Sequence, residues 1–549
     1  LFPIYPDGCV TQKASGRPYC FLYTLKGAGE EEWAPRFTYY GFRYVQVENA
    51  VPDTRSGQGG RPALEEPPVK PGAGPGNADD EFPRIVRLHL LHTRNSAPVA
   101  GSFECSNELF NRIFRLIRWA IQSNLASVPT DCPHREKLGW LEQAYLMGNS
   151  IQYNFHIEPL YMKLLGDMME AQLENGLVPD IAPEFVPFEG GFRDSPEWGS
   201  AAVILPWCLY KWYGTTAAME RAYPMMRGYA AYLDAKAQDH ILSHGLGDWY
   251  DLGPNPPGES QLTPIALTAT ATYYHDLDLL ARMAGILGRN ADAAEYGRRA
   301  AEVRGAFNAR FFDRDAKIYA TGSQTSMAMP LCLGLAEEAE RKAVFENLVR
   351  AIEKDGKALT AGDIGFHYLV KALEEGGASE LIYEMNSRSD VPGYGYQLAK
   401  GATALTESWP AREDVSNNHM MLGHIMEWFY TGLAGIRQSG DSAGFEKVVI
   451  DPHPVGDISW AKARYHSVRG EIASDWRIRE GKFILDVEIP AGARALVYMP
   501  ASGAADVSEG GRPASEAEGV SFAGTDAGRA VFEVRSGQYR FESRIPDKK

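Results

Sequence analysis

Apolar residues recur at three- and four-residue spacing through the middle of the chain, from about residue 106 to residue 436. Leu109, Ile113 and Leu116 begin this pattern, which is typical of helices that bury one face. Glycine, proline and asparagine interrupt the pattern and mark where helices end. We predict twelve helices, at 107–124, 138–154, 157–173, 197–213, 216–237, 260–286, 290–309, 324–334, 337–354, 362–375, 379–387 and 418–434.

Twelve helices can pair as six hairpins and close into a ring. The sequence therefore predicts an (α/α)6 barrel over residues 101–436, in which inner helices bury apolar seams and loops form one cupped face. An α-solenoid is the alternative, but the chain has no fixed repeat of about 30–50 residues.

Alternating and β-branched residues on either side of this region predict strands. Residues 53–80 are rich in glycine and proline and predict a loop or disordered insertion. We therefore predict a multidomain protein of α and β structure, in which β-sandwich domains at 1–100 and 437–549 flank the helical barrel. The predicted strands are 36–47, 84–92, 447–451, 482–489, 494–499 and 530–534.

The composition is that of a globular protein and argues against several partners. The 549 residues suffice for three to four domains of about 150 residues each. The chain has 55 lysine and arginine residues and 71 aspartate and glutamate residues, so its net charge is −16. Nucleic acid and anionic membranes are therefore poor partners, and no run of about 18 apolar residues predicts a membrane-spanning helix. Aromatic residues reach 11%, which favours surfaces that stack on flat ligands.

The densest cluster of polar and aromatic residues is Val128–Gln143, in the loop between the first two predicted helices. Asp131, Arg135, Glu136 and Trp140 lie within it, and its prolines restrict the backbone. Loops at the mouth of a rigid scaffold are where binding and catalytic residues gather. The alternative is a capping loop, in which Asp131 caps a turn and Arg135 pairs with Glu136.

A second cluster, Gly401–Trp409, surrounds Glu407 with small and apolar residues. A carboxylate in such surroundings costs free energy unless it is paired or functional. The alternative is a glutamate capped by neighbouring hydroxyl groups. Other stretches favour sugar binding, because aromatic rings stack on the CH face of a sugar while carboxylates bind its hydroxyl groups. These stretches are Pro196–Gly199, Gly247–Asp251 and Gly393–Tyr396.

Metal and nucleotide sites are not indicated. The sequence has no HExxH motif, no GxxxxGK[ST] motif and no EF-hand loop, and its six cysteines lack metal-binding spacing. His419 has no metal-spaced partner, so we expect it to form hydrogen bonds rather than to bind a metal. We predict neither a metal nor another cofactor.

Two carboxylates that are far apart in sequence can face each other across a barrel mouth, and glycoside hydrolysis needs such a pair. One carboxylic acid protonates the leaving oxygen, and the other attacks the sugar or activates water. Burial or a negative neighbour raises the pKa of the acid, and Asp131 or Glu142 near Glu136 can supply that neighbour.

Several motifs resemble those of a known family of glycosidases. Pro129–Trp140 resembles the signature of glycoside hydrolase family 78, the inverting α-L-rhamnosidases. Phe37–Tyr44 looks like the strand motif of the β-sandwich that precedes the barrel in this family. Gly401–Trp409 resembles its late-barrel motif, and Ser416–His419 with Glu427–Tyr430 resembles the stretch that closes the barrel. The resemblance extends from about residue 37 to the end of the chain, outside the glycine- and proline-rich insertion.

The resemblance implies an exo-acting enzyme that releases terminal α-L-rhamnose from an oligosaccharide, a polysaccharide or a rhamnosylated glycoside with inversion. Glu136 would be the general acid and Glu407 the general base. Their carboxyl groups would lie about 6.5–9.5 Å apart, which admits water, rather than about 5 Å. The expected sugar contacts are Asp131, Arg135, Trp140, Glu142, Gln143, Trp198, Asp248, Trp249, Trp409 and His419.

Two positions depart from the family pattern. The family usually has Thr-Gly-Asp after Leu-Gly-Trp, whereas this chain has Leu141, Glu142 and Gln143 there. Ser200 stands where many members have an aspartate. One step along a helix turns a side chain by about 100°, so Glu142 need not replace the lost carboxylate. A different linkage or aglycone is therefore an open alternative.

Three other functions remain open at this point. An (α/α)6-barrel hydrolase that acts on another linkage would keep the same two carboxylates. A uronate lyase would need a group that abstracts a proton, for which Tyr394, Tyr396 and His419 are available. A non-catalytic sugar-binding homologue would have no reason to retain Glu136 and Glu407. We expect an exported protein, periplasmic or extracellular, because polymer-degrading enzymes of this kind usually are, although no leader is present in this chain.

Overall fold

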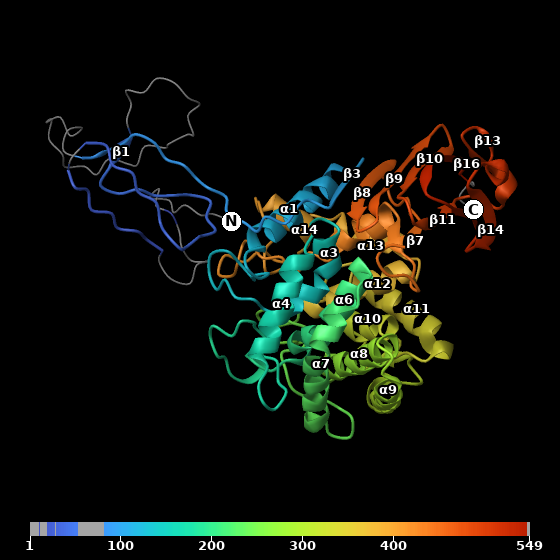
Figure 1. The fold of residues 1–549 in the computed structure, drawn as a ribbon, viewed down its shortest axis with the longest axis horizontal. Coiled ribbons are helices and arrows are strands. Elements are labelled where there is room, and N and C mark those ends of the chain that lie inside the picture. The colour runs from blue at the N-terminus through green and yellow to red at the C-terminus, as the bar shows by residue number, and fades with distance from the viewer. Residues whose placement is uncertain (1–9, 11–18, 28, 53–81, 546–549) are drawn as a thin grey trace.

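The computed structural model describes residues 10, 19–27, 29–52 and 82–545. The predicted insertion at 53–80 lies outside these residues. Figure 1 shows an extended N-terminal segment, a body of helices and a C-terminal part built from strands. The helical body and the strand-rich C-terminal part follow the predicted order along the chain.

Each range that the apolar spacing predicts to be helical contains helix in the structure. The ranges 138–154 and 197–213 are each divided into two helices, and one short helix, α14, was not predicted. The helices are α1 Glu108–Asn124, α2 Glu142–Leu146, α3 Gly148–Gln152, α4 Glu158–Ala171, α5 Pro196–Gly199, α6 Ala201–Tyr213, α7 Ala217–Lys236, α8 Ile265–Ile286, α9 Asn290–Phe311, α10 Gln324–Cys332, α11 Glu338–Lys354, α12 Asp363–Glu375, α13 Ser379–Asn386, α14 Tyr394–Ala399 and α15 Ile425–Trp428.

Helix α1 illustrates why the apolar pattern predicts helices well. Asn107 caps its start, where the side chain accepts a hydrogen bond of 3.2 Å from the Phe110 amide. Ile113, Ile117 and Ile121 recur at four-residue spacing and are fully buried. Burial of this apolar face against the rest of the body stabilises the helix.

The last predicted helix, 418–434, is shorter than expected. It is helical only from Ile425, where α15 begins and continues as a π-helix at Phe429–Leu433. Ahead of α15, the Ser416 hydroxyl accepts from the Asn418 amide at 3.2 Å and donates to the Asn418 carbonyl at 3.0 Å. Such local bonds compete with helical hydrogen bonds, so the helix starts late.

The predicted N-terminal strands are largely absent from the residues that the structure describes. Residues 36–47 form no strand, and the range 84–92 contains only β2, Arg84–Ile85, which pairs in parallel with β1, Val51–Pro52. The predictions of strands at 36–47 and along most of 84–92 are therefore wrong. Alternation alone does not make a strand, because a strand also needs the backbone groups of a neighbour. Here most side chains stay exposed, including that of Phe37.

The C-terminal strands form two sheets, and all four strands predicted in this part are confirmed. The strands are β3 Gly101–Cys105, β6 Ile436–Gln438, β7 Lys447–Ile450, β8 Trp460–Ser467, β9 Gly470–Arg479, β10 Lys482–Ile489, β11 Arg494–Met499, β12 Val507–Glu509, β13 Arg512–Pro513, β14 Val520–Asp526, β15 Arg529–Val534 and β16 Gly537–Arg544. One sheet has the order β13-β12-β16-β10-β9-β8-β3 and the other has the order β14-β15-β11-β7-β6. The rings of Phe532 in β15 and Phe541 in β16 lie 5.8 Å apart, so the two sheets share a core.

Strand β3 precedes α1 in sequence but belongs to the larger C-terminal sheet. It pairs antiparallel with β8, with Gly101 opposite Tyr465 and Cys105 opposite Ala461. The predicted boundary at residue 101 assigned this strand to the helical domain, whereas its hydrogen bonds join it to the C-terminal sheet. Strand pairing between distant segments is non-local, so no pattern within 101–105 could reveal its partner. A separate short hairpin, β4 Phe312–Asp313 with β5 Ile318–Tyr319, follows α9.

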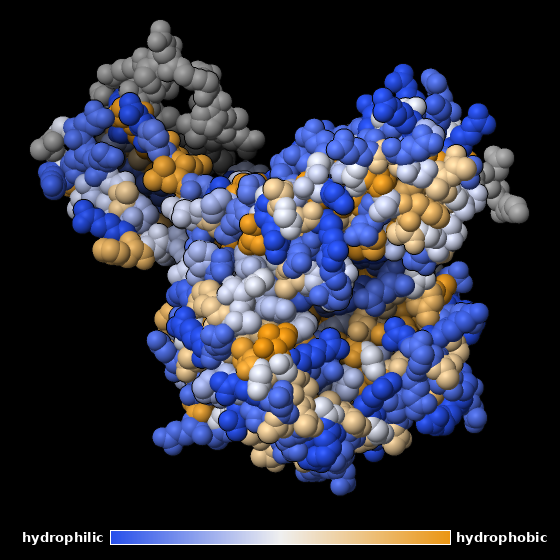
Figure 2. Space-filling model, turned by 45° about the vertical axis from the view of Figure 1, so that its right-hand side comes forward, coloured by the Kyte–Doolittle hydropathy of each residue, from blue (hydrophilic) through white to orange (hydrophobic). Residues whose placement is uncertain are grey.

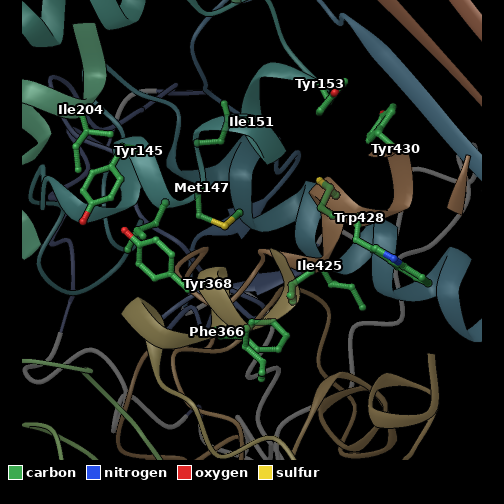
Figure 3. Packing of buried hydrophobic residues seen from close by; sticks show 14 of the residues in the cluster. Tyr145, Met147, Ile151, Tyr153, Ile204, Phe366, Tyr368, Ile425, Trp428 and Tyr430 are labelled. Carbon is green, nitrogen blue, oxygen red and sulfur yellow. The ribbon is translucent and has the colours of Figure 1, made fainter. Parts of the chain in front are cut away.

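A continuous core joins the helical body to the C-terminal sheets. Figure 3 shows side chains of α2, α12 and α15 packed together, among them Tyr145, Phe366 and Ile425. Trp476 in β9 is fully buried, and its Nε1 donates to the Leu433 carbonyl at 2.7 Å. The body and the sheets therefore stabilise each other.

The described part of the N-terminal segment projects from one side of the body (Figures 1 and 2). It contacts the body where the Gly41 amide donates to the Pro133 carbonyl at 2.9 Å. The face in Figure 2 is mostly hydrophilic. None of the helices in the described part of the chain combines the length and the apolar composition that crossing a bilayer requires.

We predict that Gly101→Ala destabilises the protein, because the structure leaves no room for a Cβ atom at this position. The added atom would lie 2.2 Å from the Tyr153 carbonyl oxygen and 2.8 Å from the Arg464 carbonyl oxygen. We expect the free energy of unfolding, measured by urea denaturation, to fall by about 1–3 kcal/mol.

The matched control is Gly305→Ala, inside α9, where a Cβ atom meets nothing within 4 Å. Alanine is favoured over glycine in a helix by about 1 kcal/mol, so this variant should be slightly more stable than the wild type. Equal stabilities of the two variants would contradict the packing argument.

Candidate active site

Arg135 lies against both of the glutamates that the sequence singles out. Its Nη2 atom is 3.3 Å from Glu136 Oε1 and 3.5 Å from Glu407 Oε2. The two carboxylate oxygens are therefore at most about 7 Å apart, although their residues are distant in sequence. The two predicted clusters, 128–143 and 401–409, thus meet at one site.

The contacts of the capping-loop alternative are also present. The Asp131 carboxylate accepts from the Leu138 amide at 2.8 Å, and the Asp131 amide donates to the Leu138 carbonyl at 3.0 Å. These bonds close residues 131–138 into a compact loop, within which Arg135 pairs with Glu136. The further contact from Arg135 to Glu407 joins this loop to a second segment, which a purely local cap does not require.

Glu136 is the more accessible of the two glutamates. Its side chain is 34% exposed, whereas that of Glu407 is 7% exposed. Glu136 Oε2 accepts a hydrogen bond of 3.0 Å from Trp140 Nε1, and the Trp140 ring packs against Phe188 with centroids 5.3 Å apart. A carboxyl group that is oriented by one donor and still partly exposed can exchange a proton with a ligand.

Glu407 is buried and accepts several hydrogen bonds. The Ser416 amide donates to Oε2 at 2.7 Å, and the Tyr250 hydroxyl also donates to this carboxylate. Burial raises the pKa of Glu407, and the charge of Arg135 together with these hydrogen bonds opposes part of that increase. The pKa stays above its ordinary value, which suits a group that accepts a proton near neutral pH.

Asp131 and His419 lie close enough to Glu136 to sense its charge. Burial, followed by the negative charge of Glu136, raises the pKa of Asp131 to about 7. Burial lowers the pKa of His419 to about 3, against the opposing effect of Glu136, so the imidazole is neutral. His419 Nδ1 accepts from the Met421 amide at 3.3 Å, which agrees with the expected hydrogen-bonding role.

Asp248 is buried and fixes the start of helix α12. Its carboxylate accepts from the Gly362 amide at 3.1 Å, from the Gly365 amide at 2.7 Å and from the Thr325 hydroxyl. Burial and the neighbouring Asp251 raise its pKa to about 7. These bonds all point into the protein, so the position of Asp248 supports a structural role beside the site.

Glu142 and Gln143, the residues that depart from the family pattern, are both buried. Burial and the charge of Asp363 raise the pKa of Glu142 well above its ordinary value. Within the described residues, Glu142 Oε2 and both heteroatoms of the Gln143 side chain have no hydrogen-bond partner of good geometry. These polar atoms lie on α2, directly after the Arg135 loop.

The predicted tryptophan contacts differ in their accessibility. Trp249 is partly exposed, and its ring meets Phe192 edge to face at 5.5 Å. Trp198 is 2% exposed and Trp409 is fully buried, and both belong to the hydrophobic core. Trp409 Nε1 donates to the Ala361 carbonyl at 2.9 Å, so its position supports a packing role rather than stacking on a sugar.

Sequence reasoning missed two side chains, one that contacts Glu407 and one that directly follows Glu136 in the chain. Tyr250 lies in a stretch that we singled out for stacking, but its contact with Glu407 depends on a backbone φ of +64°, which the sequence does not reveal. Lys137 directly follows Glu136, and its Nζ donates to the Tyr39 carbonyl at 2.7 Å. Only the adjacency of Lys137 to Glu136 could have indicated its importance.

A metal site is not apparent in the described ranges of the chain. Among residues 10, 19–27, 29–52 and 82–545, no group of three or more histidine, cysteine, aspartate or glutamate side chains is arranged to hold a metal ion.

Three family models match the chain. The bacterial alpha-L-rhamnosidase six-hairpin glycosidase domain matches residues 98–433, which is more than half of the chain. The C-terminal domain of bacterial alpha-L-rhamnosidases matches residues 435–513. Their concanavalin-like domain matches residues 5–59.

Individual proteins agree with these matches. A curated alpha-L-rhamnosidase of Streptomyces avermitilis is 32% identical over 98% of this chain and 48% of its own length. One of Formosa agariphila is 29% identical over 90% of this chain and 51% of its own length. The chain thus spans about half the length of the curated relatives it matches.

Solved structures of alpha-L-rhamnosidases are also similar to the structure of this chain. That of alpha-L-rhamnosidase from Dictyoglumus thermophilum has a TM-score of 0.76 and 32% identity, and the match covers 82% of this chain and 51% of that one. The Streptomyces avermitilis alpha-L-rhamnosidase complexed with L-rhamnose has a TM-score of 0.75 and 31% identity, over 82% of this chain and 43% of that one.

We predict that Tyr250→Phe raises the pKa of Glu407 further. The hydroxyl stabilises the ionised carboxylate, so its removal favours the protonated form. As the pH falls, the variant should therefore lose the Glu407 carboxylate at a higher pH than the wild type. The shift can be followed by carbon-13 NMR of labelled glutamate carboxyl groups during a pH titration. Tyr44→Phe, on an exposed residue of the N-terminal segment, is the control, and an unchanged or lower pKa in Tyr250→Phe would refute the contact.

Proposed function

The chain belongs to the bacterial alpha-L-rhamnosidases, glycoside hydrolase family 78, and we propose that it hydrolyses terminal α-L-rhamnosidic bonds of oligosaccharides, polysaccharides or rhamnosylated glycosides. The observation that carries the proposal is the position of Arg135 within 3.3 Å of Glu136 and 3.5 Å of Glu407. A pair of facing carboxyl groups is what glycoside hydrolysis needs. The relative complexed with L-rhamnose supports rhamnose as the sugar.

The proposed scaffold is an (α/α)6 barrel with its catalytic residues in loops at one face. The helical ranges predicted from the sequence and the match to a six-hairpin family model support this arrangement. The match of residues 5–59 to a concanavalin-like domain supports an N-terminal β-sandwich as well. The two facing C-terminal sheets support a second sandwich.

In this proposal Glu136 is the general acid. Its partial exposure lets it reach the oxygen of a leaving group, and the bond from Trp140 Nε1 orients one carboxyl oxygen while the other pairs with Arg135. Protonation of the leaving oxygen by a positioned acid typically contributes about 10²–10⁴ to the rate.

Glu407 is the general base that activates water. The positive charge of Arg135 favours the ionised form of this buried group, because it opposes the effect of burial on the pKa. The facing oxygens lie at most about 7 Å apart, a bound that admits both the range of about 6.5–9.5 Å of inverting enzymes and the spacing of about 5 Å of retaining ones. Inversion is part of the proposal because the motifs around the two glutamates resemble those of the inverting α-L-rhamnosidases.

Asp131 adds negative charge beside the acid. Its pKa of about 7 means that it is partly ionised at neutral pH. A carboxylate near the reacting sugar stabilises the positive charge that develops in an oxocarbenium-like transition state.

The alternative functions have weaker support. A uronate lyase would use Tyr394, Tyr396 or His419 to abstract a proton. Tyr394 is buried and its hydroxyl already donates to the Leu422 carbonyl. A protein that only binds sugar can use carboxylates to bind hydroxyl groups, but it does not need two of them facing each other across a shared arginine, as glycoside hydrolysis does.

We predict that Glu136→Gln and Glu407→Gln each lower kcat on an aryl α-L-rhamnoside with a poor leaving group by about 10²–10⁴. Binding of free rhamnose, measured by calorimetry, should change little, because the amide keeps the shape and one acceptor of the side chain. Glu338→Gln, at a side chain that is 96% exposed, is the control. Near-normal turnover in either site variant would overturn that assignment.

We further predict that β-L-rhamnose is the first anomer released. Water activated by Glu407 would attack the face opposite the leaving group, which inverts the anomeric carbon. Proton NMR during the first turnovers distinguishes the anomers before mutarotation. Early α-rhamnose would exclude inversion, and an unsaturated uronate absorbing in the ultraviolet would indicate elimination instead.

A further inference from the structure

We propose that the N-terminal segment, residues 19–27 and 29–52, holds the Arg135–Glu136 loop in place through Lys137, so that Lys137 is a positioning residue for the reaction. This inference rests on the proposed function, because it assigns a role to the general acid. It adds that the acid depends on contacts from a part of the chain outside the helical body.

The Lys137 side chain ends among tyrosines of the N-terminal segment. Its Nζ donates to the Tyr39 carbonyl at 2.7 Å. The same atom lies 4.0 Å from the centroid of the Tyr40 ring, 5.0 Å from that of Tyr39 and 5.7 Å from that of Tyr19. A cation over an aromatic face contributes about 0.5–2 kcal/mol, depending on how far it is desolvated.

The backbone of Lys137 is in a conformation that needs such support. Its φ angle is +59°, in the left-handed region that residues with a Cβ atom rarely adopt. Conformations of this kind cost about 1–3 kcal/mol and persist where the surroundings fix them. Because Lys137 directly follows Glu136, relaxation of this residue would turn the peptide that carries the acid.

Three further contacts join the two segments on the other side of Glu136. The Tyr19 hydroxyl donates to the Arg135 carbonyl at 3.2 Å, and the Gly41 amide donates to the Pro133 carbonyl at 2.9 Å. A Cβ atom at Gly41 would lie 2.6 Å from Pro133 Cγ, so the two chains approach as closely as glycine allows. The Tyr39 side chain also hydrogen-bonds Thr130.

The loop is thus held from two directions. From the body, the Glu407 carboxylate pairs with Arg135 at 3.5 Å, while the bond from the Leu138 amide to the Asp131 carboxylate closes the loop on itself. From the N-terminal segment, contacts reach Pro133, Arg135 and Lys137. General acid catalysis requires the proton donor within about 2.6–3.2 Å of the leaving oxygen, so a small displacement of the loop costs much of its effect.

Loss of the Lys137 contacts should therefore impair proton donation specifically. A leaving group that is already a weak base, such as 2,4-dinitrophenolate, departs without protonation, whereas methoxide does not. A residue that merely stabilises the fold would affect both substrates equally. The two leaving groups therefore distinguish positioning of the acid from general stability.

The test compares Lys137→Met with the wild type on methyl α-L-rhamnoside and 2,4-dinitrophenyl α-L-rhamnoside, in the full chain. We expect kcat/KM to fall by about 10–100-fold on the methyl glycoside and by less than about threefold on the dinitrophenyl glycoside. Lys137→Arg keeps the positive charge and the donor, and it should recover most of the loss. Lys342→Met, at a side chain that is 90% exposed, is the control for removal of a lysine charge.

A second pair of variants tests the tyrosine side of the contact. Tyr40→Phe keeps the ring nearest to Lys137 Nζ and should behave like the wild type, whereas Tyr40→Leu should reproduce the leaving-group pattern of Lys137→Met. Hydrogen exchange at the Gly41 amide should become faster in Lys137→Met if the two segments separate, which is measured without any substrate.

If kcat/KM of Lys137→Met fell equally on the two substrates, or on neither, the positioning role would be overturned. Unchanged exchange at Gly41 would show that Lys137 does not couple the segments. If the wild type hydrolysed neither α-L-rhamnoside, the proposed function itself would fail, which is a different result from a wild type that is active and indifferent to Lys137.

Discussion

One guanidinium between two carboxylates is the interaction on which the rest of the site depends. A buried carboxylate such as Glu407 is costly unless a charge or several donors compensate for lost water. Arg135 supplies the charge, and the Ser416 amide supplies a donor at 2.7 Å. Arg135 also pairs with Glu136, so the same guanidinium faces both glutamates.

The scaffold fixes the positions of Arg135 and the two glutamates by joining segments that are distant in sequence. Asp248 connects its own loop to the start of α12 through two backbone amides, and β3 carries the chain from the C-terminal sheet into α1. Trp476 joins the larger sheet to the end of the π-helix. The sheets and the helical body therefore share one core, which limits relative motion of the segments that carry the two glutamates.

The sequence predicts the helices of this protein better than its strands, for a physical reason. Helical hydrogen bonds and the apolar face are local, so spacing such as that of Ile113, Ile117 and Ile121 suffices. Strand pairing is non-local, so the alternation at 36–47 suggested strands without a partner, while β3 paired with a sheet far along the chain.

The site shows a similar contrast between what the local sequence indicates and what depends on the folded structure. The residue types and motifs around Glu136 and Glu407 indicated a pair of carboxyl groups, because the chemistry needs them. The sequence did not predict the placement of residues that depends on backbone geometry. Tyr250 and Lys137 are examples, and both have positive φ angles. Trp409 shows the opposite error, since an aromatic residue beside a carboxylate suggested a sugar platform but completes the core.

Gln143 changes the charge of the site less than its departure from the family pattern suggests. An aspartate at this fully buried position would meet the same loss of solvation that raises the pKa of the adjacent Glu142 well above its ordinary value. A carboxyl group held neutral both donates and accepts hydrogen bonds, as the amide of glutamine does. The substitution therefore exchanges one neutral hydrogen-bonding group for another of different shape.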